Sequence, residues 1–250
     1  MENVHVVALR EALESFDIHP TKIETLCADF EQMIQMHSSP SMYWDLKANG
    51  AYKECYNVGE DSIIIKFAAE DNETDKEETI LSYAADEGLS DLFLSGIYIS
   101  LDDDKLPTEA LDYYSNSYYH YTWSNTAGTY VRGEKRGGSL QLNYMIIQKK
   151  IANTEKQLQE TDGYYVNNFS ILNYKTDFLA DENEDPIPYD TIYNSGIMSK
   201  RWLRAFIEKF GSKTFYKFVK FCRTHYISDL HENNIGYLQD GTPVILDWLS

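Results

Sequence analysis

The 250-residue sequence has few basic residues and few cysteines, and it lacks any long apolar run. Its 22 lysines and arginines are outnumbered by 40 aspartates and glutamates, which gives a formal net charge of −18. An excess of negative charge repels nucleic-acid backbones and anionic membranes, so we expect neither as a partner. No segment reaches the roughly 18 consecutive apolar residues of a membrane-spanning helix.

Cysteine is scarce in a way that indicates a reducing compartment. Cys27, Cys55 and Cys222 are odd in number and far apart. They form neither a disulfide framework nor a CxxC metal-binding pair. The first residues also lack the basic region and apolar stretch of a secretory signal. We therefore expect a cytoplasmic protein.

What the sequence does contain is typical of a soluble globular fold, with 43% hydrophobic and 25% charged residues. A chain of this length can form one two-lobed domain or two small ones. We expect residues 1–40 to form a helical extension, residues 41–150 a small lobe with a tyrosine-rich insertion, and residues 151–250 a reduced large lobe. Together these segments predict an α+β fold.

Two helices are expected in the N-terminal extension, separated by a break at Pro20. The second is expected to open at a capping box formed by Thr21 and Glu24. A packing extension of the small lobe is the favoured interpretation, and a partner-docking helix pair is the alternative. The residues expected at helical spacing are Val4, Val7, Ala8, Glu11, Ala12 and Phe16 in the first helix, and Leu26, Phe30, Met33 and Ile34 in the second.

The sequence then changes to the pattern of strands. Residues 46–56 are typical of two strands joined by a turn at Gly50, residues 57–61 of a hairpin turn, and residues 62–67 of a buried strand. A polar loop is expected at residues 70–76, then a helix from about Asp75 to Asp86 that ends before Gly88. Further strands are expected at residues 92–101 and 142–147.

Residues 102–140 are rich in tyrosine, serine, asparagine and glycine, and are predicted to form a hairpin or a long insertion. Their tyrosines could bind a ligand or line a half-buried sheet face. Residues 160–196 are expected to be irregular, with a solvated acidic run at residues 181–185. Two amphipathic helices follow at residues 199–210 and 212–225.

The strongest chemical signal lies near the C-terminus. Asp229 and Asn234 have the D-x-x-x-x-N spacing of a kinase catalytic loop, and Asp247 follows the short apolar strand Pro243-Val-Ile-Leu246. Phosphoryl transfer requires a carboxylate to orient the acceptor hydroxyl and oxygen ligands for Mg²⁺. In such a site Asp229 is the base, and Asn234 and Asp247 hold the metal. The alternative is that Asp229 and Asn234 only cap a turn.

The sequence around these residues resembles that of the protein kinase-like superfamily. The segment D-L-H-E-N-N-I-G followed by P-V-I-L-D-W is most similar to the aminoglycoside phosphotransferase-like branch and to short kinase-like proteins of bacteriophages. The resemblance implies a two-lobed protein kinase-like fold that binds ATP and Mg²⁺. If the chain is phage-encoded, its compartment is the host cytoplasm.

The resemblance also implies roles for residues upstream. Ile63-Ile-Ile-Lys66 is similar to the V-A-I-K strand, so Lys66 would pair with the α- and β-phosphates of the nucleotide. Gly50 corresponds to a glycine of the Gly-rich loop, although an ordinary hairpin turn is the alternative. Either Glu77 or Glu78 would pair with Lys66. The strand that contains Met145 and Ile147 resembles the hinge, whose backbone binds adenine.

The resemblance covers about residues 42–250, and only three residues follow Asp247. We therefore expect a truncated large lobe without an activation segment. The first hypothesis is an ATP- and Mg²⁺-dependent phosphotransferase acting on a hydroxyl of a protein or small molecule. The second is a catalytically inactive, pseudokinase-like module that binds a host or partner protein. The retention of Lys66, Asp229, Asn234 and Asp247 favours the first hypothesis.

Overall fold

The computed structural model has an α+β fold composed of two compact units. Unit 1 comprises Met1–Thr74 and Gly96–Lys149, and unit 2 comprises Asp75–Ser95 and Lys150–Ser250. The residues that the structure describes are 3–49, 53–68, 71–102, 104–107, 119–124, 126, 129–135, 141–162, 200–225, 227, 230 and 232–247.

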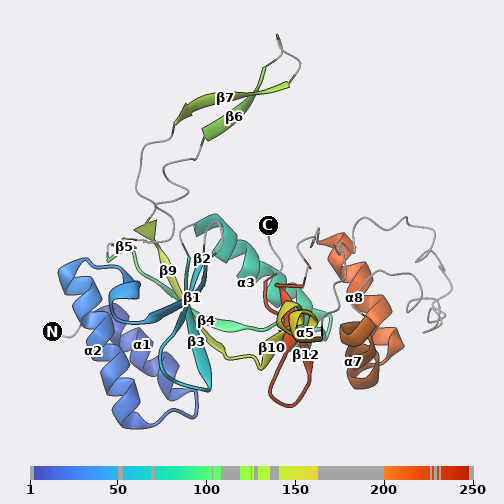
Figure 1. Ribbon diagram of the computed structural model, residues 1–250, viewed down its shortest axis with the longest axis horizontal. Helices are drawn as coiled ribbons and strands as arrows, with labels where there is room; N and C mark the ends of the chain where they lie inside the picture. The colour runs from blue at the N-terminus through green and yellow to red at the C-terminus, as the bar shows by residue number, and fades with distance from the viewer. Residues whose placement is uncertain are drawn as a thin grey trace. The chain divides into compact units, whose positions relative to one another are not determined.

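Unit 1 is built on a five-stranded antiparallel sheet (Figure 1). The strand order is β1-β2-β3-β9-β4, so β9 pairs with both β3 and β4. The order is not sequential, because β9 arrives in the chain only after a long insertion. The strands are β1 (Asp45–Asn49), β2 (Lys53–Asn57), β3 (Ile63–Ala68), β4 (Gly96–Ser100) and β9 (Tyr144–Lys149).

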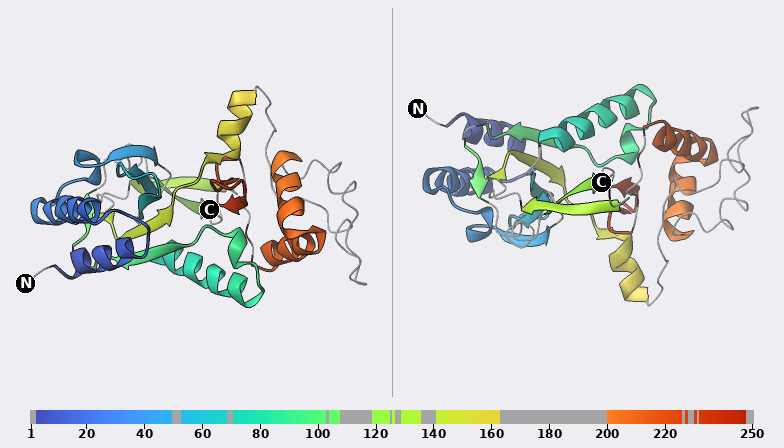
Figure 2. Two further views of the ribbon diagram at one scale, coloured as in Figure 1. Left: turned by 90° about the horizontal axis from the view of Figure 1, so that it is seen from below. Right: turned by 90° about the horizontal axis from the view of Figure 1, so that it is seen from above.

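One face of this sheet is covered by two helices, α1 (Val4–Glu14) and α2 (Pro20–Met36), which lie side by side (Figures 1 and 2). Side chains alternate between the two faces of a strand. The odd-numbered residues of β3 and β9, such as Phe67 and Ile147, are therefore buried in one apolar core with both helices. The N-terminal helices thus share their core with the sheet.

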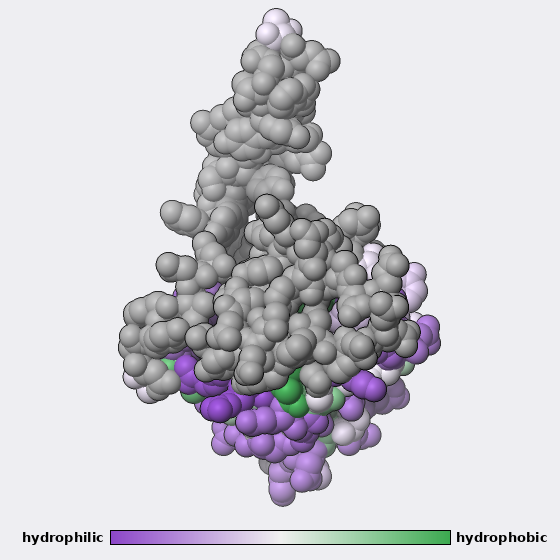
Figure 3. All heavy atoms as spheres, turned by 90° about the vertical axis from the view of Figure 1, so that its right-hand side faces the viewer, coloured by the Kyte–Doolittle hydropathy of each residue, from purple (hydrophilic) through white to green (hydrophobic). Residues whose placement is uncertain are grey.

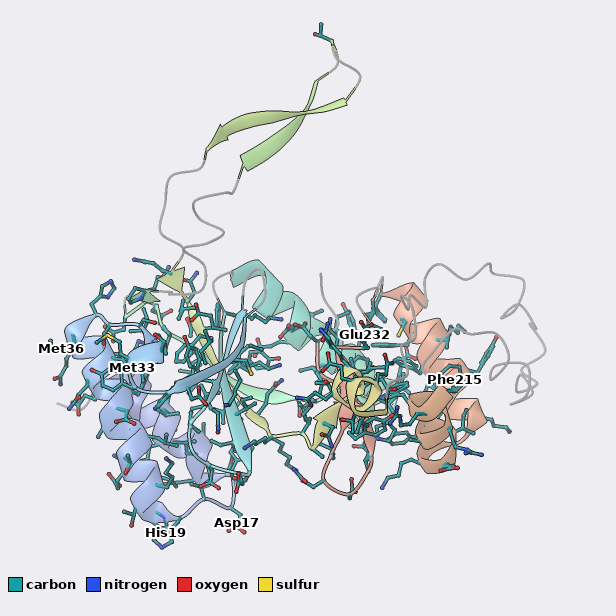
Figure 4. The ribbon with its side chains drawn as sticks, in the orientation of Figure 1. Asp17, His19, Met33, Met36, Phe215 and Glu232 are labelled. Atoms are coloured by element: carbon teal, nitrogen blue, oxygen red, sulfur yellow. The ribbon has the colours of Figure 1, made fainter. Side chains whose placement is uncertain are left out.

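The face that α1 buries matches the expected one only in part: Ala12 is buried, and Ala8 packs against the same core, as does Phe16 just beyond the helix. The buried residues of α1 are His5, Val6, Leu9, Ala12 and Leu13, whereas Val4 is 70% exposed. The expected face of α2 is confirmed for Leu26, Phe30 and Met33. Met36, at the last residue of that helix, is 72% exposed (Figure 4).

The start of α2 also differs from the prediction. The N-cap is His19, whose Nδ1 accepts a hydrogen bond from the Thr21 amide at 3.3 Å. Pro20 does not break the helix but begins it, because a proline at the first helical position has no amide that needs a partner. A short 3-10 helix, η1 (Pro40–Met42), then leads into β1.

The tyrosine-rich insertion contains the expected hairpin. Strands β6 (Tyr119–Ser124) and β7 (Thr129–Lys135) form a two-stranded antiparallel ribbon. At its base, β5 (Leu106–Pro107) pairs with β8 (Gln141–Leu142). Neither pair belongs to the five-stranded sheet.

Helix α3 (Asp71–Asp86) follows β3 and begins earlier than predicted. The polar loop expected at residues 70–76 is therefore wrong from Asp71 onward, because the helix already begins there. The helix ends near Gly88, whose φ of +64° is a left-handed conformation that glycine adopts without strain. From Asp75 to Ser95 the chain belongs to unit 2, since Ile80 and Ala84 pack in its core.

Unit 2 combines helices with a three-stranded antiparallel sheet of order β10-β11-β12. Its core is rich in aromatic side chains, among them Trp202, Phe206, Phe215 and Phe218; Figure 4 labels Phe215. Its elements are η2 (Ser90–Leu92), β10 (Asn153–Thr154), α5 (Glu155–Asp162), α7 (Lys200–Phe210), α8 (Ser212–Thr224), β11 (Ile235–Tyr237) and β12 (Pro243–Ile245).

On the face drawn in Figure 3, most of the visible described residues are hydrophilic. Within the described part of the chain, none of the helices combines the length and apolarity needed to cross a bilayer.

Candidate functional site

The β11–β12 hairpin of unit 2 positions two of the predicted metal ligands. Ile235 pairs with Ile245, and Tyr237 pairs with Pro243. The turn between the strands is closed by Asp240, whose Oδ1 accepts a hydrogen bond from the Thr242 amide at 2.9 Å. Gly241 follows with a φ of +81°, which explains why an Asp-Gly pair is found here.

The backbones of Asn234 and Asp247 lie near each other at the end of this hairpin opposite to the turn. The Leu246 amide donates a hydrogen bond to the Asn234 carbonyl oxygen at 2.7 Å, which extends the pairing by one step. Asp247 is the next residue, and both predicted ligands are half-buried. Amide and carboxylate oxygens at one strand end are suitable ligands for Mg²⁺.

Two protein ligands are too few to complete the coordination shell of a metal ion by themselves. Among the residues that the structure describes, no group of three or more His, Cys, Asp and Glu side chains could hold a metal ion. Mg²⁺ commonly uses one or two carboxylates together with substrate phosphates and waters, so a two-ligand arrangement fits its chemistry. Asp229, the predicted base, lies outside the described residues.

A buried polar cluster supports β11, and sequence reasoning did not find it. Tyr237 Oη donates a hydrogen bond to Glu155 Oε2 at 2.7 Å. Gln159 Nε2 lies 3.4 Å from Glu155 Oε1, and Arg201 Nε lies 3.6 Å from the same oxygen. Glu155 is fully buried. These contacts connect β11, α5 and α7, and they hold the strand that begins directly after Asn234.

Burial in this cluster raises the pKa of Tyr237 well above its usual range. Loss of hydration is the largest cause, and the hydrogen bond to Glu155 and its negative charge act in the same direction. Tyr237 therefore remains a neutral donor to the carboxylate at physiological pH.

One signal in the sequence could have located this cluster. Thr154 and Gln157 form a reciprocal capping box at the start of α5. The Thr154 amide donates to Gln157 Oε1 at 2.9 Å, and the Gln157 amide donates to Thr154 Oγ1 at 3.2 Å. This T-x-x-Q pattern marks the helix that carries Glu155, although it does not identify Tyr237 as a partner.

The approach to β11 is also fixed by backbone contacts. The Ala152 amide donates to the Tyr237 carbonyl oxygen at 2.8 Å, and the Lys156 amide donates to the carbonyl oxygen of Glu232 at 2.9 Å; Figure 4 labels Glu232. A Cβ atom on Gly236 would lie 2.7 Å from the Asn153 carbonyl oxygen. Only glycine therefore permits β10 to approach β11 so closely.

In unit 1, Lys66 lies on β3, on the sheet face opposite to α1 and α2. Its cross-strand partners are Cys55 on β2 and Ile146 on β9. Lys66 is half-buried, and its positive charge lowers the pKa of the neighbouring Cys55 thiol, although burial raises that pKa by more. The ammonium group of Lys66 therefore lies close to this face of the sheet.

Met145 and Ile147, predicted at the hinge, are engaged within the sheet. Both are fully buried in the core beneath the helices, on the face opposite to Lys66. Their backbones pair with β3 on one side and with β4 on the other.

The two glutamates considered as partners of Lys66 differ in burial. Glu77 is 4% exposed, whereas Glu78 is exposed. Gly50 lies outside the described residues. The structure thus places Asn234 and Asp247 in unit 2. Of the predicted polar site residues that the structure describes, Lys66 lies on the sheet of unit 1.

Comparisons of the chain with protein-family models, with curated proteins and with solved structures found no match.

Proposed function

We propose that the protein is an ATP- and Mg²⁺-dependent phosphotransferase that moves the γ-phosphoryl group to a hydroxyl of a protein or small molecule. The observation that carries the proposal is the hydrogen bond between Leu246 and Asn234, which closes the hairpin and brings Asn234 next to Asp247. Asn234 and Asp247 would hold Mg²⁺ against the phosphates, and Asp229 would orient the acceptor hydroxyl.

The order of elements along the chain supports a kinase-like fold. In protein kinases the phosphate-binding lysine lies on the third strand, and its glutamate partner lies on a helix of the small lobe. Lys66 is on the third strand, and the helix that follows carries the buried Glu77. The hinge and the Gly-rich loop would then come from the end of β9 and from Gly50.

The alternative function is a catalytically inactive, pseudokinase-like module that binds a host or partner protein. The feature that favours it is the β6–β7 ribbon, since this insertion belongs to neither of the two larger sheets. A scaffold of this kind has no need of Asn234 and Asp247 as metal ligands, so their role separates the two functions.

The first experiment measures thermal unfolding with and without Mg-ATP. A ligand at a hundredfold excess over Kd stabilises the folded state by about 2.7 kcal/mol. We expect this stabilisation in the wild type and its loss in Asp247→Asn. The matched control is Asp240→Asn, the same substitution at the exposed turn of the same hairpin. A wild type that shows no shift with Mg-ATP would refute nucleotide binding.

The second experiment follows transfer of a labelled γ-phosphate from ATP to the protein and small-molecule fractions of a cell lysate. Asp229→Ala should abolish transfer while the stabilisation by Mg-ATP persists, because the base does not hold the nucleotide. Transfer that survives Asp229→Ala would remove this residue from the base role. Mg-ATP binding without any transfer would favour the inactive binding module.

A further inference from the structure

Helix α8 of unit 2 (Figure 1) carries exposed lysines and contains no aspartate or glutamate. Lys213, Lys217 and Lys220 are all exposed. Their spacing places them on one side of the helix, within about 10 Å along its axis. The other side of α8 packs in the aromatic core of unit 2 through residues such as Phe215 and Phe218. We call Lys213, Lys217 and Lys220 the lysine row.

Within the described part of the chain, the lysine row lacks the carboxylate partners that other exposed cations have. Neither Lys213 nor Lys220 forms an ion pair with a described residue. Lys217 Nζ donates a hydrogen bond to the carbonyl oxygen of Glu87, a neutral acceptor that leaves the positive charge in place. Arg204 on α7, by contrast, forms an ion pair with a glutamate one turn along its own helix. The lysine row therefore presents a concentrated positive charge to the solvent.

These positive charges oppose the stability of the helix that carries them. Lys213 lies in the first turn of α8, where the helix dipole disfavours a cation. Lys217 follows Lys213 at i+4 and Lys220 follows Lys217 at i+3, and like charges at these spacings repel each other. Residues that break a local rule of stability are expected at functional sites. An anionic partner therefore explains the lysine row better than the stability of α8 does.

We propose that the lysine row is a docking surface for an acidic segment of a partner protein. The rest of the chain decides the class of anion, because the net charge is −18 and an extended polyanion such as DNA or an anionic bilayer would be repelled by the remaining surface. A short acidic segment can lie along α8 while the rest of its protein stays beyond the Debye length, about 8 Å at physiological ionic strength. This inference does not rest on the proposed function, since a phosphotransferase and an inactive module could both use such a surface.

The chemistry of lysine determines how such a segment is recognised. An ammonium group on a flexible stem contacts a carboxylate as a point charge, so the lysine row selects for closely spaced negative charges and not for one fixed sequence. Each exposed ion pair contributes little, and salt screens it. The lysine row therefore binds weakly and reversibly, and its main effect is to steer and orient the partner.

The test measures binding of a fluorescein-labelled peptide of ten glutamates to the full chain by fluorescence anisotropy, at about 20 mM and about 150 mM salt. The wild type should bind this peptide at the lower salt and more weakly at the higher salt, and a peptide of ten glutamines should not bind. The triple variant Lys213→Gln, Lys217→Gln and Lys220→Gln should bind the glutamate peptide about tenfold more weakly or less, because three exposed ion pairs are lost.

A matched control removes three exposed lysines from other elements and makes the same change in net charge. Its Kd for the glutamate peptide should stay within about twofold of the wild-type value, because these lysines are not in the lysine row. Circular dichroism melts verify that both triple variants are folded. The control carries the substitutions Lys47→Gln, Lys149→Gln and Lys156→Gln.

Several outcomes would overturn the inference. A wild type that does not bind the glutamate peptide at the lower salt refutes it, and so does equal binding by the wild type and the variant of the lysine row. Ten-nucleotide thymidine DNA and phosphatidylserine vesicles are tested in the same way. If either binds through the lysine row more tightly than the glutamate peptide, the assignment to an acidic protein segment is wrong.

Stabilisation by Mg-ATP keeps this inference separate from the proposed function. The wild type and the variant of the lysine row should be stabilised equally by Mg-ATP, because the lysine row is not part of the proposed nucleotide site. Mg-ATP binding without peptide binding refutes the docking surface and leaves the phosphotransferase standing. Peptide binding that depends on the lysine row, in a protein that does not bind Mg-ATP, supports the docking surface and refutes the proposed function.

Discussion

Within the part of the chain that the structure describes, a buried tyrosine–glutamate hydrogen bond occurs in each unit, and the two bonds are built differently. In unit 1, Tyr56 Oη bonds Glu54 Oε2 at 2.6 Å, two residues away on the same strand. In unit 2, Tyr237 Oη bonds Glu155 Oε2 at 2.7 Å across a sequence separation of 82 residues. The same kind of hydrogen bond therefore stabilises a single strand in unit 1, whereas in unit 2 it joins a strand to a helix that is distant in the sequence.

The difference matches what each unit must hold in place. Lys66 of unit 1 lies on a continuous five-stranded sheet, in which the backbone ladders on both sides fix the position of its strand. Asn234 and Asp247 of unit 2 lie on a short hairpin, which needs side-chain contacts to α5 and α7 to hold its orientation. Unit 2 should therefore be more sensitive to the loss of single polar contacts.

The largest expected effects come from the two aromatic cores. Phe67→Ala in unit 1 and Phe206→Ala in unit 2 each remove a fully buried ring and should lower the free energy of unfolding by about 3–5 kcal/mol. Hydrogen exchange read by mass spectrometry should show the loss of protection concentrated in the unit that carries the change. Equal loss in both units would mean that the two cores unfold as one.

The next effect compares two glycines at close strand contacts. Gly236→Ala places a Cβ atom 2.7 Å from the backbone oxygen of Asn153, which cannot move easily, and should cost about 3 kcal/mol. Gly96→Ala places a Cβ atom 2.6 Å from Ile146 Cγ2, 2.8 Å from Gln148 Cγ and 3.1 Å from the Ile147 carbonyl oxygen. Both side chains are fully buried and cannot move aside easily, so this change should cost a similar amount. Urea unfolding of both variants checks this, and a loss below about 1 kcal/mol for either variant would contradict it.

Substitution of the two buried tyrosines, Tyr237 and Tyr56, is expected to have a smaller effect on stability. Tyr237→Phe leaves Glu155 without its hydroxyl donor and should destabilise the protein by about 1–2 kcal/mol. Tyr56→Phe tests the same loss in unit 1. Mg-ATP should stabilise Tyr56→Phe as it does the wild type, and should stabilise Tyr237→Phe less, because Tyr237 lies on the strand that follows Asn234. Equal stabilisation of both variants by Mg-ATP would contradict a positioning role for Tyr237.

Tyr237 should also make stability depend on alkaline pH. Its pKa is raised in the folded protein, so the unfolded chain loses this proton first as the pH rises above about 10. The contribution is complete below that pH, and it is lost by up to about 1.4 kcal/mol per pH unit above it. Urea unfolding between about pH 9 and 11 should show a shallower decline for Tyr237→Phe than for the wild type.

The smallest effects are expected at surface ion pairs. Arg204 and Glu208 are both largely exposed one turn apart on α7, with 3.6 Å between Nε and Oε1. Arg204→Gln should change stability by at most about 0.5 kcal/mol. Arg10→Gln, which removes the pair between α1 and Glu24 of α2, should cost slightly more because Arg10 is partly buried. Thermal melts at low and high salt measure both.

Local patterns in the sequence predict much of this fold. The apolar spacing of Leu26, Phe30 and Met33 identifies the buried face of α2, and the Asp-Gly turn with its flanking apolar residues identifies the β11–β12 hairpin. The closeness of Asn234 and Asp247 follows from that hairpin alone. These features depend on residues near one another in the chain.

Features that depend on distant residues escape such reasoning. Helix α1 offers two apolar stripes, and contact with α2 and β4 selects the one containing Leu9 and Leu13. The partnership of Tyr237 with Glu155 requires α5 to be placed beside β11. Cys55 becomes the cross-strand partner of Lys66 only through the register of β2 with β3.

The position of β9 between β3 and β4 has a consequence for synthesis on the ribosome. The partner of Lys66 on β9 is Ile146, so β3 leaves the ribosome long before the strand that pairs with it. At a translation rate of about 5–20 residues per second, the nascent chain exposes the edges of β3 and β4 for several seconds. During this time α1 and α2 have only part of their apolar surface covered. We therefore expect chaperones to bind a nascent chain whose synthesis stalls before β9 has been made.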